Sequence, residues 1–234
     1  MSKYLIITYS ILILILFSSS AKSQSQLPTE WQFIDYCLND SCNSTNWYPI
    51  SNIIVTIPEL PNCNIRVGGY MRICGNQIEI AVMGYKIENF SQDCMNDFNN
   101  LTDEEKNKIQ VSLYRAMTLK IFNDEYNSLP AHLKFQLECG FGGKVYTTGS
   151  FASCSKSCFF YSPSTGVFES IVVNCSEYCC ILKREICFDK ITNQVVVNET
   201  WTNNVIGPNS CFPPMYNCFG AFATTDCFPL CETE

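Results

Sequence analysis

The chain of 234 residues has a formal net charge of −7, and 47% of its residues are hydrophobic. An acidic chain of this kind is not expected to bind nucleic acid or anionic lipid through a basic face. Sixteen cysteines beside a single histidine, without paired Cys-x-x-Cys motifs at finger spacing, exclude the common zinc modules and favour disulfides formed in an oxidising compartment.

The N-terminus has the pattern of a secretory signal peptide. Lys3 supplies a positive charge, residues 4–17 are largely apolar, and the small residues of 18–23 follow. We expect cleavage after Ser23, with cleavage after Ala21 as the alternative. An uncleaved anchor is a weaker alternative, because a spanning helix needs about 20 apolar residues. The sequence therefore predicts a secreted, extracellular protein, or a periplasmic one in a bacterium, with no membrane span in the mature chain.

The first structured part of the mature chain is predicted to be a β-hairpin. A polar entry segment, residues 24–49, leads to a strand-like run at 53–57. Residues 65–74 and 77–87 then form the two strands of the hairpin, separated by Gly75-Asn76. A two-residue loop of the Gly-X type suits a type II′ turn.

One long helix is indicated between residues 103 and 127. Thr102 and Glu105 have the spacing of a capping box, in which each side chain bonds the other residue's backbone N–H. Apolar side chains recur at helical spacing from Ile109 to Phe122, and Pro130 closes the segment. We interpret the apolar stripe as core and not as a cofactor surface.

Strands return in the second half of the chain. Residues 144–151 and 168–174 are strand-like. Residues 181–191 and 195–201 are predicted to form a second hairpin around Thr192-Asn193.

The sixteen cysteines are expected to pair completely into disulfides, but the sequence does not give the connectivity. They are Cys37, Cys42, Cys63, Cys74, Cys94, Cys139, Cys154, Cys158, Cys175, Cys179, Cys180, Cys187, Cys211, Cys218, Cys227 and Cys231. Cys179 and Cys180 should bond to different partners, because adjacent residues of a strand point to opposite faces. A bond between these two neighbours is a minor alternative.

The composition changes at residue 207, where cysteine, proline and phenylalanine become frequent and no secondary structure is indicated. We therefore divide the chain into a signal peptide at 1–23, a disulfide-rich α+β domain at 24–206 and a Cys/Pro/Phe-rich tail at 207–234. The tail is either a small stapled appendage or a strap over the main core.

Six Asn-x-Ser/Thr sequons mark candidate glycosylation sites, whose use depends on the organism. They are Asn39, Asn43, Asn89, Asn100, Asn174 and Asn198.

No motif marks a catalytic, cofactor or metal site, and we predict none. His132 has no Gly-x-Ser-x-Gly partner, and oxidised cysteines cannot act as thiolate nucleophiles. A hydrolase that uses two carboxylates needs only a pair of acids, but none of the candidate acids lies in a known signature. These acids are Asp35, Glu59, Glu79, Glu88, Glu138, Glu169, Glu185 and Asp189.

Trp31, Trp47 and Trp201 are the candidate ligand contacts. They suit stacking on sugars or anchoring of a protein partner, and packing in the core is the competing interpretation.

The sequence thus predicts an α+β fold. Antiparallel β-hairpins pack against one main helix, disulfides staple the domain, and the tail is irregular. The predicted function is that of a secreted, non-catalytic binding module or extracellular structural module, whose partner is an extracellular protein or a glycan. The alternatives are a small carbohydrate-active hydrolase with two carboxylates and a protease inhibitor with a disulfide-braced loop.

Overall fold

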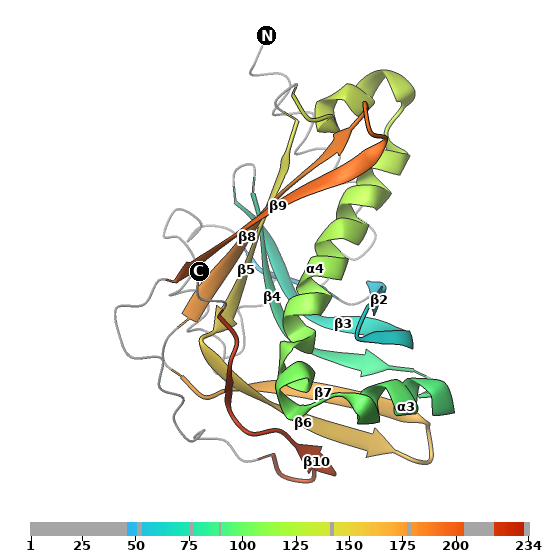
Figure 1. Cartoon of the computed structure of the whole chain (residues 1–234), viewed down its shortest axis with the longest axis vertical. Helices are drawn as coiled ribbons and strands as arrows, with labels where there is room; N and C mark the ends of the chain where they lie inside the picture. The colour runs from blue at the N-terminus through green and yellow to red at the C-terminus, as the bar shows by residue number, and fades with distance from the viewer. Residues whose placement is uncertain are drawn as a thin grey trace.

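The computed structural model describes residues 46–50, 53–74, 77–88, 90–140, 143–176, 179–203 and 218–231. These residues form a mixed α+β fold in which one large sheet is crossed by a long helix (Figure 1). The elements in chain order are β1 (Tyr48–Ile50), β2 (Ile54–Ile57), β3 (Leu60–Cys74), β4 (Gln77–Ile87), α3 (Gln92–Asn100), α4 (Asp103–Ser128), the 3-10 helix η4 (Ala131–Leu137), β5 (Val145–Ala152), β6 (Cys154–Ser162), β7 (Val167–Asn174), β8 (Cys179–Asp189), β9 (Gln194–Asn203), β10 (Ala223–Thr224) and β11 (Phe228–Pro229). The predicted signal peptide and the turn residues Gly75-Asn76 lie outside the described residues.

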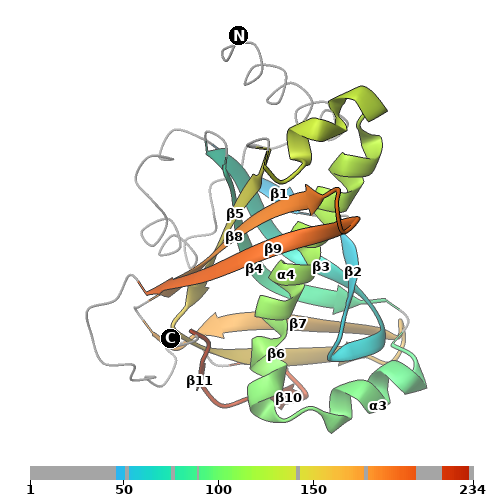
Figure 2. The same cartoon turned by 45° about the horizontal axis from the view of Figure 1, so that its top comes forward.

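The sheet divides into two arms at β4. One edge of β4 pairs with β3, which confirms the first predicted hairpin. The other edge is shared, because residues 77–80 pair with β5 and residues 84–87 pair with β7. One arm is therefore β5–β8–β9, and the other is β7–β6 with the short β10 and β11. Figure 2 shows β8 and β9 above β6 and β7, with α4 lying across both arms.

The pairing of β4 with β5 is parallel, which corrects the expectation of antiparallel hairpins alone. The reason is the connection between them. The chain leaves the C-terminal end of β4, passes through α3, α4 and η4, and returns to the N-terminal end of β4, where β5 begins. Parallel neighbours need a long crossover of this kind.

The second predicted hairpin is confirmed by the antiparallel pairing of β8 with β9. Its turn is closed by Asp189, whose carboxylate accepts hydrogen bonds from the Ile191 N–H (2.9 Å) and the Thr192 hydroxyl (2.8 Å). These hydrogen bonds lower the pKa of Asp189. Asn193 takes the left-handed conformation, with φ at 55°, which asparagine tolerates better than most residues.

The predicted helix is confirmed as α4, and it begins with the predicted capping box. The Thr102 hydroxyl accepts a hydrogen bond from the Glu105 N–H at 3.2 Å, and the Glu105 carboxylate accepts one from the Thr102 N–H at 2.8 Å. The bonds from Thr102 lower the pKa of Glu105.

Replacing Thr102 with alanine should lower the free energy of unfolding by about 1 kcal/mol, because the first turn of α4 loses its cap oxygen. Urea denaturation followed by circular dichroism measures the change. Thr200→Ala, which alters an exposed threonine of β9, serves as the control. Equal midpoints for wild type and Thr102→Ala would show that the cap does not stabilise the helix.

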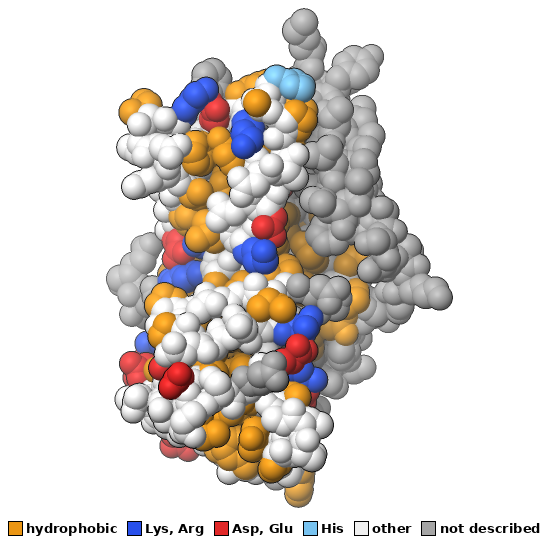
Figure 3. Space-filling view, turned by 90° about the vertical axis from the view of Figure 1, so that its right-hand side faces the viewer, with side chains coloured by type: hydrophobic (Ala, Val, Ile, Leu, Met, Phe, Trp, Pro, Cys, Tyr) orange, Lys and Arg blue, Asp and Glu red, His pale blue; other side chains and the backbone are white. Residues whose placement is uncertain are grey.

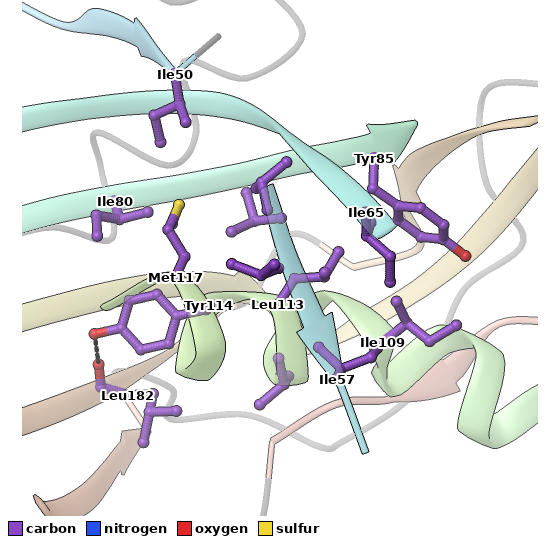
Figure 4. Close-up of a cluster of buried hydrophobic side chains, with 14 of the residues drawn as sticks. Ile50, Ile57, Ile65, Ile80, Tyr85, Ile109, Leu113, Tyr114, Met117 and Leu182 are labelled. Carbon is purple, nitrogen blue, oxygen red and sulfur yellow. Dashed lines mark hydrogen bonds between the residues drawn. The ribbon is translucent and has the colours of Figure 1, made fainter. Parts of the chain in front are cut away.

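The core lies between α4 and the inner face of the sheet, and β2 covers a further side of the helix. Burial of α4 is therefore wider than one apolar stripe, and Val111 and Ser112 are buried as well. The Ser112 hydroxyl donates to Glu59, just after β2, at 2.5 Å. On the sheet side the Tyr114 hydroxyl donates to the Leu182 carbonyl at 3.2 Å (Figure 4).

Glu125 is buried near the C-terminal end of α4, and this burial raises the pKa of its carboxyl group. A raised pKa in the folded state means that the protonated form is favoured. The corresponding stability is present at low pH and is lost as the pH rises through the folded-state pKa.

Glu125→Gln should therefore raise the melting temperature at pH 7, and the gain should shrink as the pH falls towards 4. Thermal denaturation at both pH values measures it. Asp124→Asn, which alters the exposed neighbour paired with Lys120, should show no such gain. A Glu125→Gln gain that stays constant with pH would refute the electrostatic explanation.

Candidate functional site

Residues 218–231, the part of the predicted tail that the structure describes, lie along β6. β10 pairs with the middle of β6, and β11 pairs with its start. Three disulfides bind the same segment to the rest of the fold: Cys158–Cys218, Cys175–Cys227 and Cys180–Cys231. The segment is thus fixed near both ends and between them.

A buried polar network also ties this segment to the start of α4. The Asn107 side-chain carbonyl accepts hydrogen bonds from the hydroxyls of Thr225 (2.9 Å) and Ser157 (3.0 Å). The Asn107 amide donates to the Asp226 carbonyl at 3.0 Å. A fully bonded network of this kind fixes the position of each group in it.

The segment begins with a tight turn, residues 218–222, which we call the aromatic turn. The Ala221 N–H donates to the Cys218 carbonyl at 3.2 Å, and Gly220 has a φ of 77°. Glycine suits this position, because a left-handed residue is needed at the third place of such a turn. The turn is held on one side by the Cys158–Cys218 bond and on the other by the Phe222 N–H, which donates to the Phe159 carbonyl at 3.0 Å.

Phe219 lies within the aromatic turn and is 87% exposed, and Phe222 is 59% exposed. Phe222 contacts the fully buried Phe168, with ring centroids 6.1 Å apart. Phe168 in turn packs on Phe90, whose ring also contacts the partly exposed Tyr161. Aromatic side chains therefore continue from the core to the surface, and Figure 3 shows hydrophobic side chains gathered at the lower end of the molecule, where α3, β6 and β10 lie.

A single exposed hydrophobic residue is normal in a soluble protein and needs no explanation. Ile191, 96% exposed in the hairpin turn after β8, is such a residue. Phe219 differs because a second exposed ring follows three residues later and because a disulfide and a backbone hydrogen bond fix its turn. An exposed apolar patch on a rigid support is typical of an interaction site.

The acids proposed for hydrolysis that the structure describes are each held by a partner of their own. Asp35 lies outside the described residues. Five of the others form ion pairs: Glu79 with Arg72, Glu88 with Arg66, Glu169 with Lys86, Glu185 with Lys144 and Glu138 with Lys190. Glu59 bonds Ser112 and Asp189 closes its turn, as described above. Across the described ranges, no group of three or more metal-ligating side chains is found.

An acid that the sequence did not single out forms the most connected ion cluster. Glu199 of β9 accepts from Arg115 of α4 at 3.0 Å and faces the buried Arg184 of β8 at 2.8 Å. Arg184 also donates to the Arg115 carbonyl at 2.6 Å. Burial lowers the pKa of Arg184. The cluster joins the helix to one arm of the sheet, which is a structural role.

The described tryptophans do not form a common surface. Trp47 is buried, with 4% of its surface exposed, and the Arg72 guanidinium lies 4.6 Å from its ring centroid. It is a core residue in this structure. Trp201 is half-buried and packs on Phe151 with ring centroids 5.8 Å apart. Trp31 lies outside the described residues, and His132 is exposed in η4.

All thirteen cysteines of the described residues are disulfide-bonded. Besides the three bonds to the tail segment, Cys63 pairs with Cys94 and Cys139 pairs with Cys187. The bond of Cys180 to Cys231 confirms that Cys180 is not joined to Cys179. Cys37, Cys42 and Cys211 lie outside the described residues.

Of the six sequons, Asn100 and Asn198 are exposed and Asn174 is half-buried. Asn39, Asn43 and Asn89 lie outside the described residues. Whether any of them carries a glycan stays a prediction.

This disulfide content is consistent with an oxidising environment, and no helix in the described part of the chain is long and apolar enough to cross a membrane. Comparisons with models of protein families, with curated proteins and with solved structures gave no match. The function must therefore be inferred from the geometry of the described residues.

Proposed function

We propose that the chain is an exported, non-catalytic protein that binds a partner protein and uses Phe219 as its anchor. The observation that carries this proposal is a phenyl ring, 87% exposed, on a turn that the Cys158–Cys218 disulfide and the Phe222–Phe159 hydrogen bond hold in place. A few aromatic anchors supply most of the binding energy in protein interfaces. A rigid anchor also loses little conformational entropy when it binds.

The neighbouring aromatic residues have a supporting role in this proposal. Phe222 and Tyr161 are only partly exposed. Phe222 contacts the buried Phe168, and Tyr161 contacts Phe90, which packs on Phe168. They would contact the rim of the partner's pocket and exclude water from the anchor, as the near-neutral residues around a hot spot do. The partner is thus expected to present a deep apolar pocket within a flat apolar rim.

Inhibition of a protease is the second candidate, and the same turn favours it. An inhibitor presents one fixed side chain to the specificity pocket of the enzyme, and a phenyl ring suits the hydrophobic pocket of a chymotrypsin-like protease. The hydrolase alternative has no comparable support, because each of its described acids is engaged with a partner of its own.

The binding test is an array of purified, folded extracellular proteins probed with wild type and two variants. Phe219→Ala should abolish at least one interaction that wild type makes. Ile191→Ala, which alters an even more exposed apolar residue on another turn, should keep it. A parallel assay of chymotrypsin-like proteases tests the inhibitor candidate. Interactions that all survive Phe219→Ala, or an array without any interaction, would refute the proposed anchor.

Export is tested separately by N-terminal sequencing of the protein recovered from the culture medium. We expect the mature chain to begin at Gln24, because the short apolar run is followed by a small-residue cleavage site. Lys22 is the alternative first residue. Intact Met1 in a membrane fraction would contradict export by a cleaved signal peptide.

A further inference from the structure

A groove of about 460 Å³ lies on the outer face of the sheet, over β3, β4 and β7. Val67 of β3 is buried in the core with α4, so the adjacent Arg66 and Gly68 point to the opposite face. Gly68 and Gly84, which are cross-strand neighbours, form the floor of the groove. A cavity of this size is within the range of small-ligand sites.

The packing of the protein requires Gly84 but not Gly68. A Cβ atom on Gly84 would lie 2.2 Å from the Ser170 carbonyl oxygen, so the approach of β7 demands a glycine there. A Cβ atom on Gly68 would meet nothing closer than the Gly84 oxygen at 3.5 Å, an ordinary contact, and Gly68 does not have a positive φ. The register of β3 against β4 shifts between Gly68 and Gly69, as it does at a β-bulge. Glycine inside a strand weakens it and often marks such a bulge or a place where a ligand or another backbone approaches closely.

The charges at the groove cancel in pairs. Lys86 forms an ion pair with Glu169, and Arg66 forms one with Glu88 at 3.0 Å. All four side chains keep contact with solvent. The rim therefore selects neither an anion nor a cation, and the ligand that it suits is neutral.

A neutral ligand that covers these groups must also replace their hydrogen bonds to water, because an unpaired polar group costs free energy. An apolar side chain cannot do so, whereas a hydroxyl group both donates and accepts. The half-exposed Ile171 and the partly buried Met83 supply apolar contact beside the glycine floor. A sugar ring meets both needs, because it carries hydroxyl groups at its edge and C–H groups on its face.

A second hollow of about 390 Å³ adjoins the groove at Arg66, which lines both. Its other lining residues are Ile54, Asn64 and Glu88. The Asn64 side chain offers an amide that can donate to one hydroxyl and accept from another. Two hollows that share one residue suit a ligand of at least two linked units.

We infer that this outer face binds a neutral oligosaccharide, with one ring over Gly68 and the next beside Asn64. The site is separate from the aromatic turn, because none of its lining residues belongs to residues 218–231. The inference therefore does not rest on Phe219.

The test is isothermal titration of the full mature chain with maltose, cellobiose, lactose and N,N′-diacetylchitobiose, and with sialyllactose as a charged probe. At least one neutral disaccharide should bind, and Gly68→Val should weaken its affinity at least tenfold without lowering the melting temperature. Phe219→Ala is the matched control and should leave the affinity unchanged. A second measurement on wild type, the ¹⁵N spectrum, should show shifts of the Gly68 and Gly84 amide signals with the sugar.

Absence of binding by every neutral sugar would overturn the inference, as would binding of the charged probe alone. An unchanged sugar affinity of a folded Gly68→Val variant would also overturn the inference. If Gly68→Val does not fold, the amide shifts decide, and shifts confined to other parts of the chain would place the ligand elsewhere.

Discussion

Replacing Arg72 with methionine should lower the free energy of unfolding by about 3–5 kcal/mol, since the change leaves a buried charge without its counter-ion. Arg72 and Glu79 are cross-strand neighbours on β3 and β4, both are buried, and their charged atoms lie 2.6 Å apart. Chemical denaturation of the purified variant measures the loss.

The same strand provides the control for this prediction. Arg66 pairs with Glu88 at 3.0 Å, but both side chains are accessible to solvent. Arg66→Met should therefore cost only about 0–1 kcal/mol. The double change Arg72→Met with Glu79→Leu should recover most of the loss, because it removes the unpaired carboxylate. Equal losses for Arg72→Met and Arg66→Met would show that burial does not govern the effect.

Phe168→Ala should cost about 3–5 kcal/mol, because truncation of a buried aromatic ring leaves a cavity. Phe168 is fully buried, and its ring contacts those of Phe90, Phe98 and Phe159. Urea denaturation provides the measurement.

Phe219→Ala is the comparison for Phe168→Ala and should change stability by less than about 0.5 kcal/mol, as exposed substitutions do. A large loss for Phe219→Ala would mean that its ring is packed in solution, and the proposed anchor would lose its basis. A small loss for Phe168→Ala would mean that the ring cluster does not support the aromatic turn.

Local signals predicted the parts of the fold that depend on neighbouring residues. The capping box of Thr102 and Glu105 predicted the start of α4. The turn-forming residues after Cys74 and after Asp189 predicted the two hairpins. These features succeed because each is decided within a few residues of chain.

Besides the short strands β1, β10 and β11, the elements β6, α3 and η4 were not predicted, for different physical reasons. β6 carries two cysteines and three serines and is nearly continuous with β5, from which only Ser153 separates it. Its burial comes from β7 on one side and from residues 218–231 on the other, which the local sequence does not show. α3 has a cap at Ser91 but lacks the glutamate of a capping box, and η4 is a 3-10 helix without a side-chain cap.

The candidate site depended on disulfide pairing, which sequence reasoning leaves open. The run Cys218-Phe219-Gly220 was visible as part of the irregular tail, and its glycine indicates a turn. Only the bond from Cys218 to Cys158 and the pairing of β10 with β6 show that this turn is fixed and that Phe219 lies outside. Likewise, Trp47 was a predicted ligand contact, but it is buried. The strand that follows it, β1, pairs with β3, so that Tyr48 lies opposite Met71, and the local sequence does not show this pairing.

The measurement that tests the account most directly is the ratio of Kd values for wild type and Phe219→Ala with a partner protein identified on the array. Loss of a central anchor costs at least about 2 kcal/mol, which corresponds to roughly a 30-fold weaker Kd. We expect that ratio together with an unchanged melting temperature and a ratio near one for Ile191→Ala. A Phe219→Ala ratio below about threefold would contradict the proposal that this ring is the binding anchor.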